Sequence, residues 1–204
     1  MNEKTYRAVV CACLGPPENL SIRQLPRATL PAGSVRIEVR AAGLNFPDVL
    51  MIRGTYQHKP AMPFVPGLEA AGVVTEVGAG VLGFAVGDAV MAQLRTGGYA
   101  EEVVADAAKV QPLPQRFSFA EGATFLVAHI TAYHALATRA ALAPGQTLLV
   151  LGAAGGVGLA AVQVGKALGA RVLAAASTSD KLESRQQTVP TTSSTTARSR
   201  SRSR

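Results

Sequence analysis

The chain has 204 residues, of which 48% are hydrophobic and 16% charged, with a net charge of +7 and a mean hydropathy of +0.22. This composition allows a sizeable core in one large or two small domains and indicates a globular protein. No apolar run reaches the roughly 18 residues of a membrane-spanning helix, and the opening residues do not form a signal peptide. We therefore expect a cytoplasmic protein without a membrane partner.

The positive charge is concentrated near the C-terminal end. Five arginines and no acidic residue follow Ser184, which leaves a charge of only +2 for the rest of the chain. Nucleic-acid binding is therefore not expected of the globular part. An Arg-Ser tail that contacts phosphates without sequence preference is the alternative, but no aromatic residue accompanies these arginines to stack on bases.

The cysteines and histidines do not predict a metal site. Cys11 and Cys13 are one residue apart on a predicted strand, so their side chains point to opposite faces and we expect them to be packing residues. His58, His129 and His134 lack the spacing of metal ligands.

The N-terminal part of the chain has the pattern of short antiparallel strands. Glycine- and proline-rich turns separate these strands, for example Gly15-Pro16-Pro17 and Pro31-Ala32-Gly33. Many short strands with glycine corners favour a small, partly open β-barrel. The predicted strands are 6–13, 35–42, 70–77, 88–93 and 99–105.

A different pattern begins at about residue 120. Residues 120–140 carry Ala, Leu and His at helical spacing, and Pro144-Gly145 precedes an apolar strand at 147–151. A glycine turn, a helix at about 155–168 and a strand at 171–176 follow, which is the opening of a parallel βαβ unit. We therefore predict a β domain over residues 1–122 and the start of an α/β domain over residues 123–183.

The turn Gly152-Ala-Ala-Gly-Gly-Val-Gly158 stands between the apolar strand and the helix, the context that a dinucleotide-binding fingerprint requires. At the second glycine position, Gly155 lets the backbone approach a pyrophosphate, and at the third Gly158 lets the helix pack on the strand. The N–H groups at the helix N-terminus are unpaired and suit a phosphate. A tight corner without a ligand is the alternative. The predicted cofactor-binding residues of the turn are Ala153, Ala154, Gly155, Gly156, Val157 and Gly158.

The end of the second parallel strand predicts which cofactor binds. An NAD-specific site places Asp or Glu there, whereas this chain continues Ala176-Ser177-Thr178-Ser179-Asp180-Lys181. Ser177 and Thr178 can donate hydrogen bonds to a 2′-phosphate, and Lys181 supplies a positive charge. We therefore predict NADPH as the cofactor, although Lys181 can also be an ordinary exposed helix residue.

With its two parts taken together, the chain resembles the medium-chain dehydrogenase/reductase superfamily, in its quinone oxidoreductase (zeta-crystallin-like) branch, over roughly residues 4–183. The resemblance implies a GroES-like β-barrel domain followed by a Rossmann domain that is incomplete here. It also implies a family that is typically homo-oligomeric. The motifs are Gly43-Leu44-Asn45-Phe46-Pro47-Asp48 with Gly54-Thr55-Tyr56, the run from Pro63 to Gly72, Gly87-Asp88-Ala89-Val90, Gly97-Gly98-Tyr99-Ala100-Glu101, Thr131-Ala132-Tyr133 and the glycine turn.

The resemblance is to the zinc-free branch of this superfamily. Its zinc alcohol dehydrogenases carry a Cys and a His where this chain has Ala42 and Leu68, and Glu69 alone cannot build a tetrahedral site. The resemblance therefore implies hydride transfer from NADPH to a quinone or a related electron-poor carbonyl or enone compound, without a metal. An enoyl or alkenal reductase of the same superfamily is the alternative.

The resemblance also assigns roles to residues. It implies that Asn45, Asp48, Tyr56 and Thr131 are catalytic or positioning residues, that Phe46 lines the cleft beside the nicotinamide, and that Tyr56 is a candidate proton donor. Plainer interpretations remain for three of them: Asn45 as a turn cap, Asp48 as a cap of the helix that follows it, and Tyr56 as a packing residue. Glu69 is expected to be structural.

The resemblance stops after Leu182-Glu183. Residues 184–204 are rich in Ser, Thr and Arg and are predicted to be disordered. Codons for Gln186–Ala197 can be chosen so that a shifted frame reads Ala-Asp-Gly-Ala-Asp-Asp-Val-Val-Asp-Tyr-Gly, close to the continuation that the family implies, so we expect a frameshift. Strand four, beside which a dinucleotide binds, is then missing. We therefore expect impaired activity, with an inactive remnant as the alternative.

Overall fold

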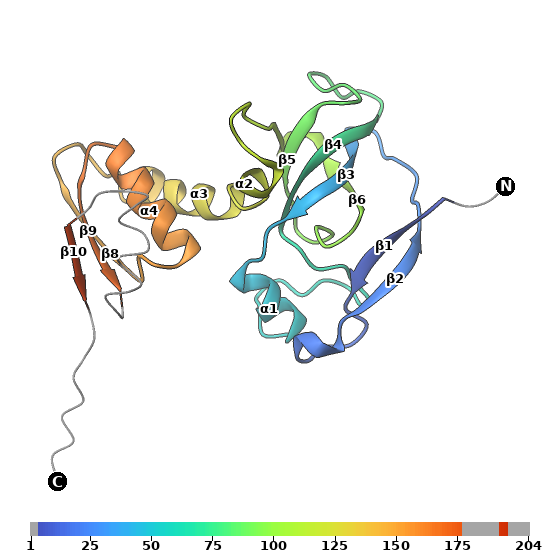
Figure 1. The fold of residues 1–204 in the computed structure, drawn as a ribbon, viewed down its shortest axis with the longest axis horizontal. Helices are drawn as coiled ribbons and strands as arrows, with labels where there is room; N and C mark the ends of the chain where they lie inside the picture. The colour runs from blue at the N-terminus through green and yellow to red at the C-terminus, as the bar shows by residue number, and fades with distance from the viewer. Residues whose placement is uncertain (1–3, 177–191, 196–204) are drawn as a thin grey trace, which may run out of the picture. The chain divides into compact units, whose positions relative to one another are not determined.

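The computed structural model describes residues 4–176 and 192–195, and Figure 1 gives the order of the elements along the chain. The chain divides into two compact units, residues 1–127 and 128–204. The dividing line falls inside helix α3 (Leu126–Tyr133).

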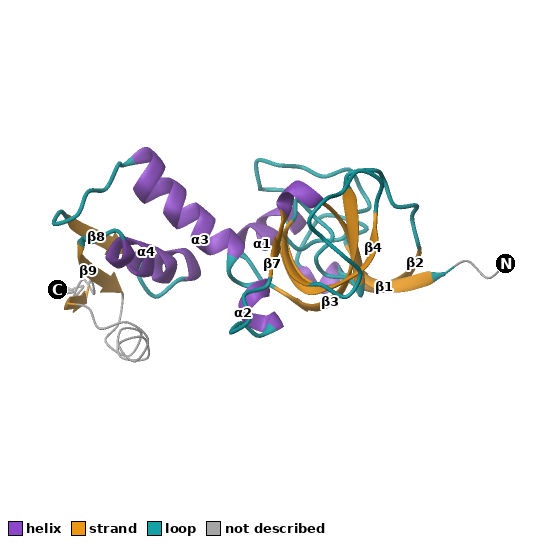
Figure 2. Cartoon of the chain, turned by 90° about the horizontal axis from the view of Figure 1, so that it is seen from above, coloured by secondary structure: helices purple, strands orange, loops and turns teal. Residues whose placement is uncertain are grey.

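The first unit is a curled antiparallel β-structure. Strands β1 (Thr5–Val10) and β2 (Ser21–Pro26) form a two-stranded sheet, and five further strands form a sheet in the order β6-β3-β4-β5-β7. Figure 2 shows this larger sheet wrapping around its interior, so the predicted partly open barrel is confirmed. The five strands are β3 (Ser34–Ala42), β4 (Glu69–Val77), β5 (Ala89–Gln93), β6 (Glu102–Asp106) and β7 (Val110–Pro112).

The core of this unit is formed by alternate side chains of the strands, which face the inside of the sheet. Val35 and Ile37 on β3 are completely buried, as is Val74 on β4, because every second side chain of a strand faces the same side of the sheet. Two short helices, α1 (Phe46–Ile52) and α2 (Phe119–Ala123), complete the unit together with two single 3-10 turns, η1 (Pro17–Asn19) and η2 (Ala107–Lys109).

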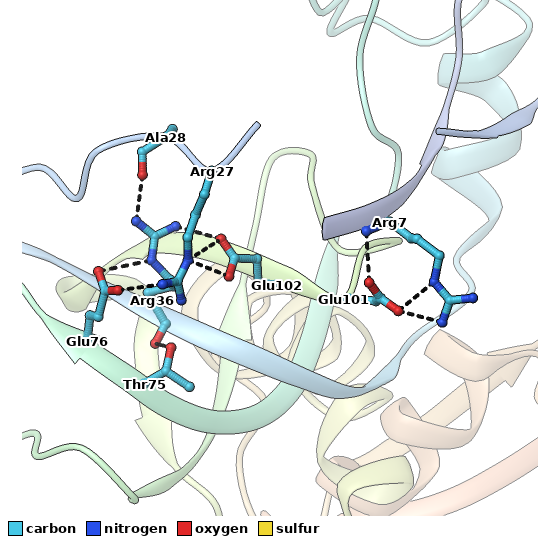
Figure 3. Close-up of polar contacts among 8 residues, drawn as sticks. All are labelled: Arg7, Arg27, Ala28, Arg36, Thr75, Glu76, Glu101 and Glu102. Atoms are coloured by element: carbon cyan, nitrogen blue, oxygen red, sulfur yellow. Dashed lines mark hydrogen bonds and ion pairs between the residues drawn. The ribbon is translucent and has the colours of Figure 1, made fainter. Parts of the chain in front are cut away.

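A cluster of paired charges joins the start of the unit to the sheet (Figure 3). Arg36 is only 3% exposed and contacts Glu102 at 2.8 Å, Glu76 at 3.1 Å and the carbonyl oxygen of Ala28 at 2.6 Å. Arg27 contacts the same two glutamates, each at 2.8 Å. We call these four charged residues the Arg36 cluster. It ties the segment after β2 to β3, β4 and β6.

The second unit is a small parallel α/β structure. Helix α3 runs into a π-helical turn, η3 (His134–Arg139), and is followed by β8 (Thr147–Leu151), α4 (Gly156–Ala167) and β9 (Arg171–Ala176). β8 and β9 pair in parallel, and α4 packs on one face of them through Val150, Val162 and Val172. On β8 the alternate residues Leu149 and Leu151 are 56% and 69% exposed.

The structure differs from the sequence-based expectations in several places. The predicted helical region 120–140 is interrupted between α2 and α3 and ends as a π-helical turn. Residues Thr192–Thr195 form strand β10, paired in parallel with β9, within the tail that was predicted to be disordered. β10 pairs with the edge of β9 that β8 leaves free, and backbone pairing of this kind is open to any extended segment, whatever its side chains. The rest of that tail lies outside the described residues.

The two cysteines also behave differently from each other. Cys11 is buried and bridges the backbone of Phe64, as expected of a packing residue, whereas Cys13 lies beyond the end of β1 and is exposed. The predicted strand 6–13 ends at Val10 because the turn through Gly15 begins earlier than the apolar pattern suggests.

Candidate functional site

Asn45 and Asp48 together begin helix α1. Asn45 has an extended backbone and its carbonyl oxygen accepts the N–H of Asp48 at 3.0 Å, while its own N–H donates to Oδ2 of Asp48 at 2.9 Å. Asn45 is therefore the residue before the first helical turn, and Asp48 lies within that turn. Asp48 lies inside the helix and not before it, but its side chain still helps to cap the helix, as the third-residue acid of a capping box with Asn45.

The carboxylate of Asp48 is buried and fully engaged. Its side chain is 1% exposed, Oδ2 also accepts the hydroxyl of Tyr99 at 2.7 Å, and Oδ1 accepts the N–H of Gly67 at 3.2 Å. Burial raises the pKa of Asp48, and the hydrogen bonds from Tyr99, Asn45 and Gly67 oppose that rise. Asp48 thus joins α1 to two loops that are distant in sequence.

Glu69 holds Asn45 from the other side. Glu69 is the first residue of β4 and is 1% exposed; its Oε1 accepts Nδ2 of Asn45 at 2.9 Å and its Oε2 accepts the N–H of Val127 at 2.9 Å. Burial raises the pKa of this carboxyl group as well. Among the described residues, no Lys, Arg or His pairs with Asp48 or Glu69.

Tyr99 is a site residue that the sequence analysis did not single out. Burial and its hydrogen bond to Asp48 raise the pKa of Tyr99 strongly, so the hydroxyl stays protonated and donates. The motif Gly97-Gly98-Tyr99 was visible in the sequence. A tyrosine next to two glycines was a signal, but its partner lies 51 residues away along the chain.

The remaining predicted residues of the first unit fall in two settings. Phe46, the first residue of α1, is 74% exposed and free to contact a ligand. Tyr56 is half-buried and packs against the apolar cluster of Cys11, Met51 and Phe64. The structure thus brings Asn45, Phe46 and Asp48 together at one helix start and places Tyr56 in a packing position.

Thr131 lies on α3, in the second unit, and is exposed. Ser177, Thr178 and Lys181, predicted to contact a 2′-phosphate, lie outside the described residues.

The glycine turn adopts the geometry of a phosphate-binding corner. A Cβ placed at Gly158 would lie 2.3 Å from the carbonyl oxygen of Gly152, so α4 approaches β8 as closely as glycine allows. At Gly156 a Cβ would meet no atom within 4 Å, and at Gly155 the nearest is 3.6 Å away. Internal packing therefore does not require glycine at these two positions. In dinucleotide-binding turns, glycine lets the backbone approach the pyrophosphate closely.

The N-terminus of α4 suits an anion. Gly155 precedes the helix and no side chain caps it, so the N–H groups of its first turn point outward without a side-chain partner. Ala153 is buried and its N–H donates to Ala175 at 3.0 Å, which fixes the turn on the sheet. Ala154 is half-buried, and Val157 is exposed beside the helix N-terminus. The turn therefore fits the pyrophosphate of a dinucleotide.

Clusters of metal-binding side chains and long apolar helices are both absent from the described residues. Within residues 4–176 and 192–195, no three His, Cys, Asp or Glu side chains gather where they could hold a metal ion. In the same residues, no helix has the length and apolar character needed to cross a bilayer.

Comparisons with known proteins agree with these observations. Residues 31–115 match the family described as the alcohol dehydrogenase GroES-like domain. Human quinone oxidoreductase is 38% identical over 180 residues, covering 87% of this chain and 55% of the human protein. The chain belongs to the quinone oxidoreductase branch of the medium-chain dehydrogenase/reductase superfamily.

Solved structures give the same result. The quinone oxidoreductase of Thermus thermophilus, reported also as a complex with NADPH, superimposes with a TM-score of 0.80 and 38% identity, covering 93% of this chain and 59% of that one. The enoyl reductase CurK superimposes with a TM-score of 0.81 and 34% identity, covering 90% of this chain and 57% of that one. The chain spans about half the length of the curated relatives it matches, mostly their GroES-like part.

Proposed function

We propose that this chain binds NADPH at the N-terminus of α4 and reduces a quinone, or a related electron-poor carbonyl or enone compound, beside Asn45. The observation that carries the proposal is the glycine turn at Gly155 and Gly156, where nothing in the protein needs a glycine and an uncapped helix end is exposed. In this proposal residues 1–122 form the catalytic domain and residues 123–183 the NADPH-binding domain.

In the proposed reaction, the bound NADPH supplies the hydride. The protein's part is to hold the acceptor and to exclude water, and this is a positioning role. Asn45 is held rigidly at two of its nitrogen atoms, and Phe46 offers an exposed aromatic surface for a planar ring. Ala42 and Leu68 carry no atom that binds a metal, which supports a zinc-independent reaction.

We place Ser177, Thr178 and Lys181 at the 2′-phosphate and Thr131 near the nicotinamide in this proposal. The matches cover 47% and 55% of two relatives, which therefore continue beyond the part that they share with this chain. The remaining part of a relative would supply the second wall of the nucleotide site.

The test is a titration of the full chain with NADPH, and with NADH for comparison, followed by fluorescence and thermal unfolding. The variant Gly155→Ala/Gly156→Ala adds two methyl groups where the protein itself has room, so its fold is kept. The control Ala167→Ser makes a comparably small change at the other end of α4.

We expect NADPH to raise the unfolding temperature of the wild type and the control, and to raise it much less for the double variant. Equal NADPH binding by all three proteins would show that the turn is not the site. No binding to the wild type would contradict the proposal as a whole.

A second candidate is the reduction of an enoyl compound, favoured by the match to the enoyl reductase CurK. The two candidates are separated by kcat/KM for a benzoquinone and for an α,β-unsaturated thioester, measured with the same preparation and NADPH concentration. Preference for the thioester would make the enoyl reductase assignment the better one.

A further inference from the structure

Asn45 is held at two nitrogen atoms by two different buried carboxylates. Asp48 accepts its backbone N–H at 2.9 Å, and Glu69 accepts its side-chain Nδ2 at 2.9 Å. Both acidic side chains are 1% exposed. The position of Asn45 is therefore determined at its backbone and at its side chain independently.

Burying both carboxylates beside Asn45 costs folding free energy, so stability by itself does not explain the arrangement. Two carboxylates are taken out of water without a cationic partner among the described residues, and the charge of Asp48 adds to the rise in the pKa of Glu69. A helix start can be capped by exposed residues of its own first turn, as Ser118 and Glu121 cap α2 in this chain, without a buried carboxylate from another strand. Departures of this kind from the simplest local solution concentrate at functional sites.

The chemistry of Glu69 determines which way the Asn45 amide faces. An ionised carboxylate only accepts hydrogen bonds, so Asn45 must turn its NH2 group, and not its carbonyl oxygen, toward Glu69. The second partner of Glu69 is the backbone N–H of Val127, which cannot rotate. We propose that Glu69 is a positioning residue that fixes the orientation of the Asn45 amide, and with it the donor and the acceptor that Asn45 presents to the substrate. This inference rests on the proposed function, in which Asn45 borders the acceptor.

The substitution Glu69→Gln should reverse the amide. A glutamine has one acceptor and one donor group, and the N–H of Val127 takes the acceptor. The glutamine NH2 then faces Asn45, whose amide must rotate so that its oxygen accepts. At all remaining contacts of the Asn45 side chain, its NH2 group and its carbonyl oxygen then exchange places. The volumes of Asn45 and of residue 69 are nearly unchanged.

The orientation can be measured directly in the full chain. The sequence has three asparagines, Asn2, Asn19 and Asn45, so labelling with 15N-asparagine gives few side-chain amide signals, and the signal missing in Asn45→Asp identifies Asn45. In Glu69→Gln we expect the Asn45 NH2 signals to shift and to lose protection from exchange. Glu38→Gln, an exposed glutamate paired with Arg40, is the control in which they stay unchanged.

A double variant separates positioning from stability. Asn45→Asp alone sets a third carboxylate against Glu69 and should lower the unfolding temperature clearly. In Asn45→Asp/Glu69→Gln the new amide donates to the new carboxylate, so we expect the unfolding temperature to return to that of the wild type. Turnover with NADPH should remain lower by roughly 10–100-fold in this double variant and in Glu69→Gln.

Unchanged Asn45 signals in Glu69→Gln would overturn the inference, and so would wild-type turnover in the double variant. If the wild type reduces neither a quinone nor an enone, the proposed function fails. The amide signals then still decide whether Glu69 orients Asn45.

Discussion

The first unit buries charge in two different ways. In the Arg36 cluster, each buried charge meets opposite charges, and the pairs hold strands together (Figure 3). Around Asn45, the buried charges are both negative and are satisfied only by N–H and O–H donors. The difference indicates that the first group stabilises the fold and that the second holds one residue in place.

The largest effect is expected from breaking the Arg36 cluster. Among the described residues, Arg36→Met leaves Glu102 and Glu76 with Arg27 as their only cationic partner, so two partly buried carboxylates share one positive charge. We expect the free energy of unfolding to fall by about 3 kcal/mol, measured by urea denaturation. Arg7→Met, in the exposed pair with Glu101, is the control and should not change the denaturation midpoint measurably. Equal effects of the two substitutions would show that burial does not distinguish the pairs.

A smaller loss is expected at Asp48. Asp48→Asn places an NH2 group against at least one of three donors, from Tyr99, Asn45 and Gly67, but it also removes a buried charge. The two effects oppose each other, and we expect a net loss of about 2 kcal/mol in the same urea measurement. A gain in stability would mean that removing the charge outweighs the mismatched donor.

Tyr99→Phe removes a single hydrogen bond to the same carboxylate. We expect a loss of about 1.5 kcal/mol, because the bond of 2.7 Å to a charged acceptor is replaced by no other donor. The pKa of Asp48 should rise further in this variant, since one of the bonds that lowers it is gone. An NMR titration of the Asp48 carboxyl carbon measures this directly, and an unchanged titration would argue against the bond.

The smallest predicted effect is a pH dependence of stability that has opposite signs at buried Glu69 and at Glu101, which is in an exposed ion pair. The pKa of Glu69 is raised in the folded chain, so above its ordinary value the folded state binds more protons than the unfolded state, and stability falls as pH rises through that window. The pKa of Glu101 is lowered by Arg7, so its contribution is lost as pH falls. The free energy of unfolding is measured across acidic pH for the wild type, Glu69→Gln and Glu101→Gln. The difference between the wild type and each variant should change with pH in opposite directions for the two variants.

Much of the fold could be predicted because the informative strands are apolar and clearly bounded. Residues 147–151 and 171–176 were predicted with the bounds observed for β8 and β9, since glycine or proline stands before each. β2 was missed because its residues are mostly exposed, so it has no alternating apolar face, and β7 because it has only three residues. Both strands are defined by their pairing partners.

The site was predictable only in part, for a similar reason. Asn45 and Asp48 are close together along the chain and form a local motif, which the sequence shows. The contacts of Tyr99 with Asp48 and of Glu69 with Val127 span 51 and 58 residues, and no local pattern indicates them. The signal available for Glu69 was its place at the start of an apolar strand. A charged side chain on a buried strand needs hydrogen-bond partners, so its presence there indicates that such partners exist.

The outward leucines of β8 have a consequence for the polypeptide in a cell. Parallel strands normally have both faces covered, yet Leu149 and Leu151 remain largely exposed on the side away from α4. Chaperones and proteases in a cell act on proteins that expose apolar surface. A polypeptide that leaves this face uncovered is therefore open to aggregation and degradation in proportion to the time for which the face stays uncovered.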